Sequence, residues 1–254
     1  MNVSFSYIAA CLLVCTCLFS SSVHAEEFIG SDCVDGECSK FVSDFDFLLL
    51  KPHLSDGFSR PDTFQLETSV RIRLAYETNE GVGLRGEFWQ FEHAESDGLD
   101  GDPSSIDTYN VDLGLYKKLR LGRGSRIELS GGVRYNDYRD LNVTEEDDPT
   151  SFGGVGGYFG LHAAQELGFK FQGYARMKWA MLYDAQQSDN LVLDFDTTRR
   201  QQEMALGIER CARIGNCLAN LRVGYEMLNL QQYQDSNEGD VGFSGLCLGI
   251  TLAR

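Results

Sequence analysis

The sequence of 254 residues predicts an all-β fold, namely an antiparallel up-and-down transmembrane β-barrel of about ten strands. Three observations support this prediction. Apolar and polar side chains alternate along ten segments, short and long connections alternate between those segments, and a short apolar leader precedes the first of them. A tilted strand needs about nine to eleven residues to cross a bilayer, and most of the segments reach that length.

The ten predicted strands follow one another along almost the whole chain. They cover residues 41–51, 64–77, 81–91, 106–119, 125–137, 152–164, 168–183, 200–211, 217–229 and 241–253. An even number of antiparallel strands places both ends of the chain on the same side of a membrane, which for this class of barrel is the periplasmic side.

Segment 64–77, with the sequence FQLETSVRIRLAYE, shows the alternation most plainly. Every second position is apolar or β-branched, at Phe64, Leu66, Thr68, Val70, Ile72, Leu74 and Tyr76. Charged side chains stand between them at Glu67, Arg71, Arg73 and Glu77. A helix turns by about 100° per residue and would scatter these apolar groups around its surface, whereas a strand places them on one face.

Later segments repeat the pattern in the same form. The fourth, fifth and ninth strands carry the apolar sets Tyr109, Val111, Leu113 and Leu115; Ile127, Leu129, Val133 and Tyr135; and Leu221, Val223, Tyr225 and Met227. In the seventh strand the apolar residues Phe169, Phe171, Met177, Trp179, Met181 and Tyr183 alternate with Lys170, Gln172, Arg176 and Lys178. The sequence therefore predicts several strands with one apolar and one charged face.

The connections between the strands sort into two kinds. Short turns are predicted after the second, fourth, sixth and eighth strands, near residues 78–80, 121–124, 165–167 and 212–216. Longer polar connections, several of them acidic, follow the odd-numbered strands. Membrane barrels place short turns on the periplasmic side and long loops on the outer side, whereas a soluble sandwich has no reason to sort its connections in this way.

A barrel in lipid turns its apolar face outward and its polar face toward the lumen. On this basis the charged side chains of the strands are predicted to face the lumen and to be possible pore-lining residues. They are Glu67, Arg71, Arg73, Arg85, Glu87, Asp112, Arg126, Glu128, Arg134, Lys170, Arg176, Lys178, Glu209, Arg222 and Glu226. A water-soluble barrel would invert the two faces, and the alternation itself fits either arrangement.

The N-terminus has the features of an export signal. Residues 1–25 contain an apolar stretch and end in Val-His-Ala, which resembles a signal-peptidase site. The predicted organisation is a signal peptide over 1–25, an N-terminal segment over 26–40 that carries Cys33 and Cys38, and an outer-membrane barrel over 41–254. Because an exported chain meets an oxidising compartment, Cys33 with Cys38 and Cys211 with Cys217 are candidate disulfides.

Several blocks resemble the Legionella-type major outer membrane protein family, especially its planctomycete members. The blocks are LRGEFWQFEH (84–93), YNVDLGLYKKLRLG (109–122), ELSGGVRYNDYRD (128–140), FGGVGGYFGLHAAQELG (152–168) and DVGFSGLCLGITLAR (240–254). The resemblance spans almost the whole chain from residue 45 onward. It implies a pore-forming outer-membrane barrel that contacts outer-membrane lipid and the barrel insertion machinery, and it implies no catalytic residues.

The predicted function is that of a porin-like barrel. It is either a passive pore for small solutes or a narrow or plugged barrel, because Arg and Glu facing each other across about ten strands are expected to form ion pairs. Two alternatives remain open. One is a non-conducting structural or adhesive anchor in the outer membrane, and the other is an exported soluble ligand-binding β-barrel. Neither the solute nor the oligomeric state follows from the sequence.

Other functions find little support in the sequence. A formal net charge of −16 argues against nucleic acid as a partner. Beyond the leader, the histidines are His53, His93 and His162, and none belongs to a recognisable catalytic or zinc-binding motif. The acidic stretch 97–102 does not match the spacing of a calcium-binding loop. No catalytic residue, metal site or cofactor is therefore predicted.

Overall fold

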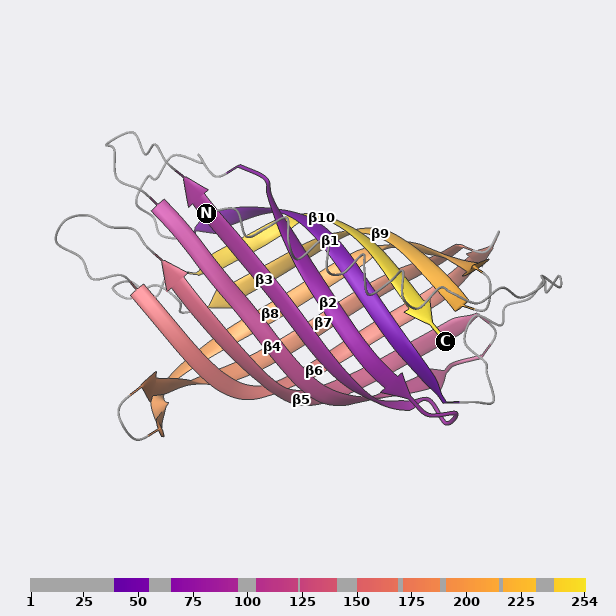
Figure 1. Cartoon of the computed structure of the whole chain (residues 1–254), viewed down its shortest axis with the longest axis horizontal. Helices are drawn as coiled ribbons and strands as arrows, with labels where there is room; N and C mark the ends of the chain where they lie inside the picture. The colour runs from indigo at the N-terminus through magenta and orange to yellow at the C-terminus, as the bar shows by residue number, and fades with distance from the viewer. Residues whose placement is uncertain are drawn as a thin grey trace.

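Ten antiparallel strands close on themselves in the computed structural model of the chain (Figure 1). The structure describes residues 39–54, 65–95, 104–122, 124–140, 150–168, 171–187, 191–214, 217–231 and 240–254. The strands are β1 (Lys40–Leu54), β2 (Glu67–Glu77), β3 (Val82–Glu95), β4 (Ser104–Arg120), β5 (Ser125–Asp140), β6 (Thr150–Gly168), β7 (Phe171–Gln187), β8 (Leu191–Ile214), β9 (Cys217–Gln231) and β10 (Val241–Ala253). No helix in this described part of the chain has the length and hydropathy required to cross a membrane.

Each strand pairs with its neighbours in the sequence, and β1 closes the sheet by pairing with β10. Beyond the last register pair, the backbone N–H of Phe41 donates to the carbonyl of Arg254 at 2.8 Å, and the N–H of Arg254 donates to the carbonyl of Phe41 at 3.0 Å. Because the sheet closes, each strand has a hydrogen-bonded neighbour on both sides within the barrel. The predicted antiparallel up-and-down barrel is thus confirmed.

The largest departure from the predicted elements is at β7 and β8. A long loop was expected before a strand at 200–211, but β7 continues to Gln187 and β8 already begins at Leu191. The two strands form a hairpin that projects from the end of the barrel (Figure 1), and their register shifts between Tyr183 and Asp184. Residues 191–198 are rich in β-branched and apolar residues, which favour a strand despite the two aspartates among them.

The first short turn, between β2 and β3, shows how the tight connections are made. Gly81 has a φ of 73°, a conformation that residues with a Cβ rarely adopt. Its backbone N–H donates to the carbonyl of Thr78 at 2.9 Å, and the N–H of Thr78 donates to the carbonyl of Val82 at 2.8 Å. These bonds reverse the chain within four residues and fix the register of the hairpin.

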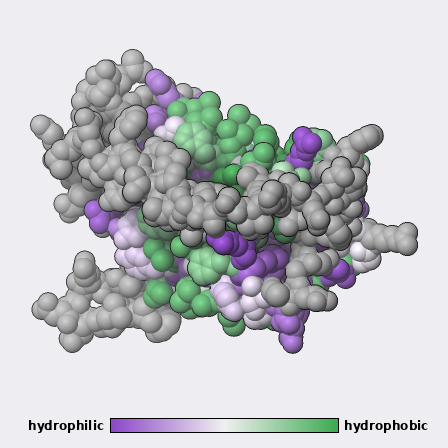
Figure 2. Space-filling model, turned by 45° about the vertical axis from the view of Figure 1, so that its right-hand side comes forward, coloured by the Kyte–Doolittle hydropathy of each residue, from purple (hydrophilic) through white to green (hydrophobic). Residues whose placement is uncertain are grey.

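The outer wall of the barrel is apolar. Large apolar side chains are exposed on every strand, among them Phe47, Leu74, Leu84, Leu113, Val133, Phe159, Trp179, Leu206, Val223 and Leu246. Figure 2 shows hydrophobic side chains gathered over the exposed wall of the strands. An apolar belt of this kind is unfavourable in water and is typical of a wall that contacts hydrocarbon.

We expect Leu113→Arg to lower the free energy of unfolding of the barrel in lipid vesicles by about 2 to 4 kcal/mol, because Arg near the bilayer midplane must be dehydrated. Leu113 lies in the middle of β4 with 54 % of its surface exposed on the outer wall. Urea titration of the barrel in vesicles measures the change.

Leu121→Arg is the matched control for this substitution. Leu121 is 59 % exposed but follows β4 in a short turn, where the arginine can reach water. We expect its effect to be within about 0.5 kcal/mol. Equal stability of the two variants would contradict contact between the outer wall and lipid.

Candidate functional site

The inward-facing side chains change in the same order along several strands. On β3, Arg85 and Glu87 are followed toward the long connections by Trp89 and Phe91. On β1, acidic side chains at 44 and 46 are followed by leucines at 48 and 50. Because side chains that share a face of a strand are two residues apart, β1 and β3 both pass from charged to apolar within the lumen. The interior is therefore divided into levels along the barrel axis.

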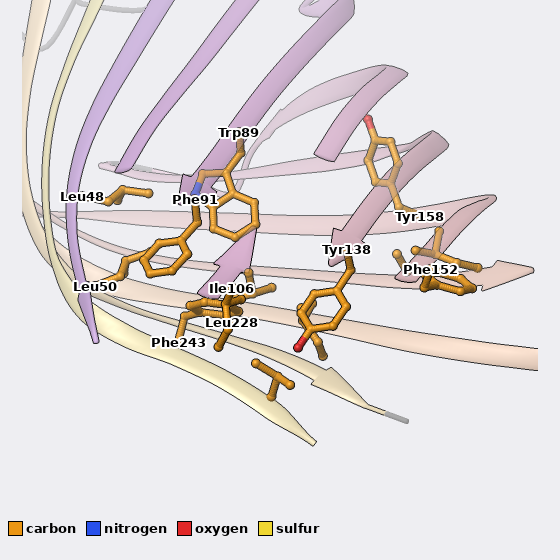
Figure 3. Packing of buried hydrophobic residues seen from close by; sticks show 14 of the residues in the cluster. Leu48, Leu50, Trp89, Phe91, Ile106, Tyr138, Phe152, Tyr158, Leu228 and Phe243 are labelled. Atoms are coloured by element: carbon orange, nitrogen blue, oxygen red, sulfur yellow. The ribbon is translucent and has the colours of Figure 1, made fainter. Parts of the chain in front are cut away.

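The level nearest the long connections is an aromatic and aliphatic cluster (Figure 3). We call it the apolar plug. Its larger members are Leu48, Leu50, Trp89, Phe91, Ile106, Tyr138, Phe152, Tyr158, Leu182, Leu228, Leu230, Val241 and Phe243. The rings of Phe91 and Phe243 have centroids 4.7 Å apart, and those of Trp89 and Phe243 are 6.0 Å apart, both in edge-to-face arrangements that aromatic pairs prefer.

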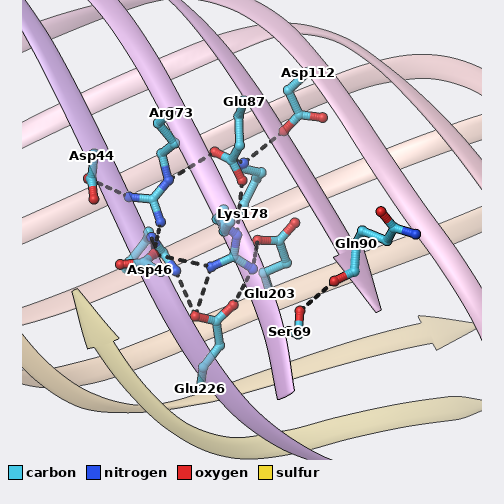
Figure 4. A network of polar contacts seen from close by, with 12 residues as sticks. Asp44, Asp46, Ser69, Arg73, Glu87, Gln90, Asp112, Lys178, Glu203 and Glu226 are labelled. Atoms are coloured by element: carbon cyan, nitrogen blue, oxygen red, sulfur yellow. Dashed lines mark hydrogen bonds and ion pairs between the residues drawn. The ribbon is translucent and has the colours of Figure 1, made fainter. Parts of the chain in front are cut away.

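Below the plug lies an ion-pair network that joins opposite walls of the barrel (Figure 4). Among the described residues it contains six carboxylates and six cations, linked by ion pairs within 4.0 Å. They are Asp44, Asp46, Glu87, Asp112, Glu203 and Glu226, with Arg71, Arg73, Arg134, Arg176, Lys178 and Arg222. The formal charges of the set cancel, so the network adds no net charge to the lumen.

Arg71 is a central member of the network. It donates to both carboxylate oxygens of Glu226, one of them at 2.9 Å, and this pair connects β2 to β9. Arg71 also lies 3.3 Å from Glu87 and 3.6 Å from Glu203. Since only 1 % of Arg71 is exposed, its charge is compensated by carboxylates rather than by water.

Arg134 is a second such centre, on β5. Its Nε and Nη2 atoms donate to the two oxygens of Asp112 at 2.6 and 2.7 Å, and Nη1 donates to Gln201 at 2.7 Å. Glu203 accepts a further contact at 2.6 Å. Lys178 then joins Asp112 to Glu87, with both distances at 2.8 Å. The planar guanidinium has several N–H donors in a fixed arrangement, which lets Arg134 contact Asp112 on β4 and Glu203 on β8 at once.

Asp46 links the network to the wall of β1. It accepts hydrogen bonds from Arg73 and from Arg222, and Asp44 accepts from the same two guanidinium groups at 2.7 Å each. A buried carboxylate loses several kcal/mol of hydration, so it persists as an ion only beside such partners. The ion pairs therefore fix the positions of the inward side chains and fill the middle of the lumen.

The described residues that were predicted to face the lumen lie on the inner wall. Arg71, Arg73, Glu87, Asp112, Glu128, Arg134, Lys178, Glu209, Arg222 and Glu226 are buried, whereas Glu67, Arg85, Arg126 and Arg176 are partly exposed. Lys170 lies outside the described residues.

Two parts of the interior were missing from the sequence prediction. Asp44, Asp46 and Glu203 belong to the network but were not among the predicted lumenal residues. The signal was present, because Asp44 and Asp46 alternate with Phe45 and with a phenylalanine at 47. The apolar plug was also missed, since Leu and Phe on the inner wall break the simple rule that the charged face points inward.

The predicted disulfide between Cys211 and Cys217 is wrong. In the hairpin of β8 and β9, Cys211 lies opposite Asn220, whereas Cys217 lies opposite Ile214. Cys211 and Ile214 are three positions apart, so their side chains point to opposite faces of the sheet. Cys217 shares the face of Ile214, and the two sulfur atoms are therefore directed away from each other. The other candidate pair, Cys33 with Cys38, lies outside the described residues.

The histidines occupy different environments. His53 is exposed near the long-connection end of β1, and its Nε2 lies 2.9 Å from the hydroxyl of Ser244 on β10. The described contacts of this pair include no carboxylate to complete a catalytic triad. His162 faces the lumen near the short turns, with its ring 5.9 Å from that of Tyr174. The side chain of His93 and the acidic stretch 97–102 lie outside the described residues.

No family model and no curated protein sequence matches the chain. The resemblance to the Legionella-type family therefore stays a prediction. Solved barrels resemble the chain at low identity. The β domain of the Bordetella autotransporter BrkA is 10 % identical, with a TM-score of 0.46 over 85 % of this chain and 98 % of its own.

Two further solved structures are similar to a comparable degree. The outer membrane protease OmpT from Escherichia coli is 12 % identical, with a TM-score of 0.43 over 91 % of this chain and 99 % of its own. The outer membrane protein OprG from Pseudomonas aeruginosa is 11 % identical, with a TM-score of 0.39 over 87 % and 98 %. Similarity at this level carries no argument about activity, so the function is inferred from the chain's own geometry.

We expect Arg134→Gln to destabilise the barrel by about 3 to 5 kcal/mol, because it removes a fully buried cation and leaves Asp112 and Glu203 with less compensation. Arg139→Gln, near the C-terminal end of β5, is the control. The Arg139 side chain is 58 % exposed in its pair with Asp137, and its loss should cost less than about 1 kcal/mol. Denaturant titration of both variants measures the difference, and similar values would show that the network does not stabilise the fold.

Proposed function

We propose that this chain is an outer-membrane β-barrel with a sealed lumen, which acts as a non-conducting structural anchor in the membrane. The observation that carries the proposal is that two consecutive levels of the lumen are filled by side chains. The apolar plug occupies the half toward the long connections, and the ion-pair network occupies the middle. A solute would have to displace both levels to pass.

The outer wall supports the membrane location in this proposal. Exposed apolar side chains occur on all ten strands, and they alternate with buried charged residues such as Arg71 and Lys178. A closed barrel is one of the two kinds of structure that can place a backbone in hydrocarbon without leaving polar groups unpaired. A soluble ligand-binding barrel requires the opposite facing, with charged side chains in water and apolar ones inside.

The packing of the interior favours an anchor over a passive pore. Trp89, Phe91 and Phe243 are at most 1 % exposed, as are Arg71 and Arg134 in the network. About eight strands leave an interior that side chains fill, and about sixteen enclose an aqueous channel, so a barrel of ten strands is near the filled end of this range. The resemblance to a pore-forming family agrees with the barrel but is not needed for the sealed lumen.

The test is the conductance of the purified full-length barrel in planar lipid bilayers. We expect no stable current steps above the bilayer baseline, because the plug and the network seal the lumen in series. Flotation of the protein with lipid vesicles verifies that it has inserted. Reproducible unitary steps from inserted wild-type protein would overturn the proposal.

Variants of each level sharpen this test. Phe91→Ala with Phe243→Ala truncates the plug. Arg71→Ser with Glu226→Ser removes one cation and one carboxylate, so the formal charges of the network still cancel. Since the levels act in series, we expect either double variant alone to stay silent and the combined fourfold variant to conduct. Circular dichroism confirms that each variant retains its strands, and current from one double variant alone would contradict the two-level seal.

A further inference from the structure

A cavity of about 150 Å³ lies inside the barrel at the end where short turns join the strands. We call it the vestibule and define it by Lys40, Arg85, Lys118, Arg126, His162 and Tyr174, which belong to its wall. A single water needs only about 10–15 Å³ of such space. The proposed anchor function makes no use of this cavity, which lies beyond the ion-pair network.

The charged groups that reach solvent in the vestibule are mainly cations. The side chains of Lys118, Arg126 and Arg85 are 27 %, 23 % and 22 % exposed, whereas their partners Glu77, Glu209 and Glu128 are 4 %, 1 % and 10 % exposed. The carboxylates thus lie behind the cations that they pair with. An ion that enters from the short-turn end therefore meets positive charge first.

The composition of the whole wall agrees with this arrangement. The described residues of the wall include eight cationic side chains and four carboxylates, namely Asp44, Glu87, Glu128 and Glu209. Each of these carboxylates already accepts an ion pair from an arginine or lysine. An arginine carries five N–H donors, so one carboxylate partner leaves donors for a second anion.

Buried polar atoms without a protein partner give a second, independent indication. Among the residues that the structure describes, the hydroxyl of Tyr174, Nε of Arg222 and Nε2 of His162 find no hydrogen-bond partner, and all three residues belong to the wall of the vestibule. Tyr174 and Arg222 are each only 6 % exposed. Buried polar groups are normally hydrogen-bonded, so the donors on Tyr174 and Arg222 require a bound water or ligand. Nε2 of His162 donates or accepts according to the tautomer of the ring. The Oδ1 atom of Asn220 is also unpartnered and accepts rather than donates.

We propose that the vestibule binds a small oxyanion of the phosphate or sulfate class, which enters from the short-turn end. Guanidinium groups and hydroxyls are the donors that such anions prefer in proteins. A divalent cation is disfavoured, because the carboxylates are the less exposed partners in the pairs. The free anion is favoured over a lipid headgroup, because the barrel wall separates the cavity from the bilayer.

The experiment compares two double variants that remove the same charges from the same two strands. Lys118→Gln with Arg126→Gln removes cations from the vestibule, and Lys117→Gln with Arg139→Gln is the control outside it. The first variant is expected to fold, because Glu77 keeps Lys40 at 3.1 Å and the hydroxyl of Tyr116 at 2.9 Å. Glu209 likewise keeps the amide of Asn220 at 2.7 Å.

Binding of inorganic phosphate is measured by titration calorimetry on the folded full-length protein in maltoside micelles at low ionic strength. We expect saturable binding to the wild type, a Kd at least about tenfold weaker in the vestibule variant, and a change of less than about twofold in the control. Absence of binding to the wild type, or equal loss in both variants, would overturn the proposal. Circular dichroism establishes that the variants are folded.

A parallel titration with a short-chain phosphatidylglycerol, kept below its micelle concentration, distinguishes the two sources of phosphate. The free anion is supported if inorganic phosphate binds and the lipid binds no more tightly than it does. Binding of the lipid without binding of inorganic phosphate contradicts the proposal, because the headgroup would then need contacts that the vestibule alone does not supply.

Discussion

Closure of the sheet between β1 and β10 is the constraint on which the rest of the structure depends. Thirteen register pairs, from Val42 with Ala253 to Leu54 with Val241, join the first strand to the last. Within the barrel every strand has a neighbouring strand on both sides, and each side chain points either to the outer wall or to the lumen. The apolar wall, the buried charges and the cavity are all consequences of that division.

A closed interior places strict conditions on the charges that it contains. An isolated buried ion costs several kcal/mol, so the charged side chains of a narrow lumen must come in compensating sets. Six carboxylates and six cations of the described lumen meet this condition, with Arg71, Asp46 and Glu226 each contacting more than one partner. Contacts across the lumen also tie strands that are not neighbours in the sheet, which stiffens the barrel against deformation.

The lumen has three levels along the barrel axis, and each has a different chemical character. The apolar plug fills the half toward the long connections, the charges of the network cancel in the middle, and the vestibule leaves cations near the short turns. This arrangement explains why a barrel with so many inward charges need not be a channel. It also separates two properties that are easily confused, namely a polar lumen and an open lumen, because polar side chains that bind one another fill space as well as apolar ones do.

Much of the architecture could be predicted from the sequence because strand periodicity is a local property. The alternation in 64–77 placed Leu74 and Arg71 on opposite faces, and a short turn was predicted near residues 78–80. The continuation of β8 from Leu191 was missed, because acidic residues in that segment obscured its preference for a strand. The register of the hairpin of β8 and β9 places Cys211 and Cys217 on opposite faces of the sheet, which excludes a disulfide between them.

The sequence by itself determined the number of strands, their order and the charged face of most of them. Only the tertiary structure decided which charges meet, because the partners of Arg71 and Arg134 lie on strands far away in the sequence. It alone decided that Trp89 and Phe243 meet inside the barrel, since barrel tilt and shear bring their levels together. The alternation with a period of two assigns each side chain to a face of the sheet. Its level along the barrel axis, and the residue that it meets on the facing wall, are set only when the sheet closes.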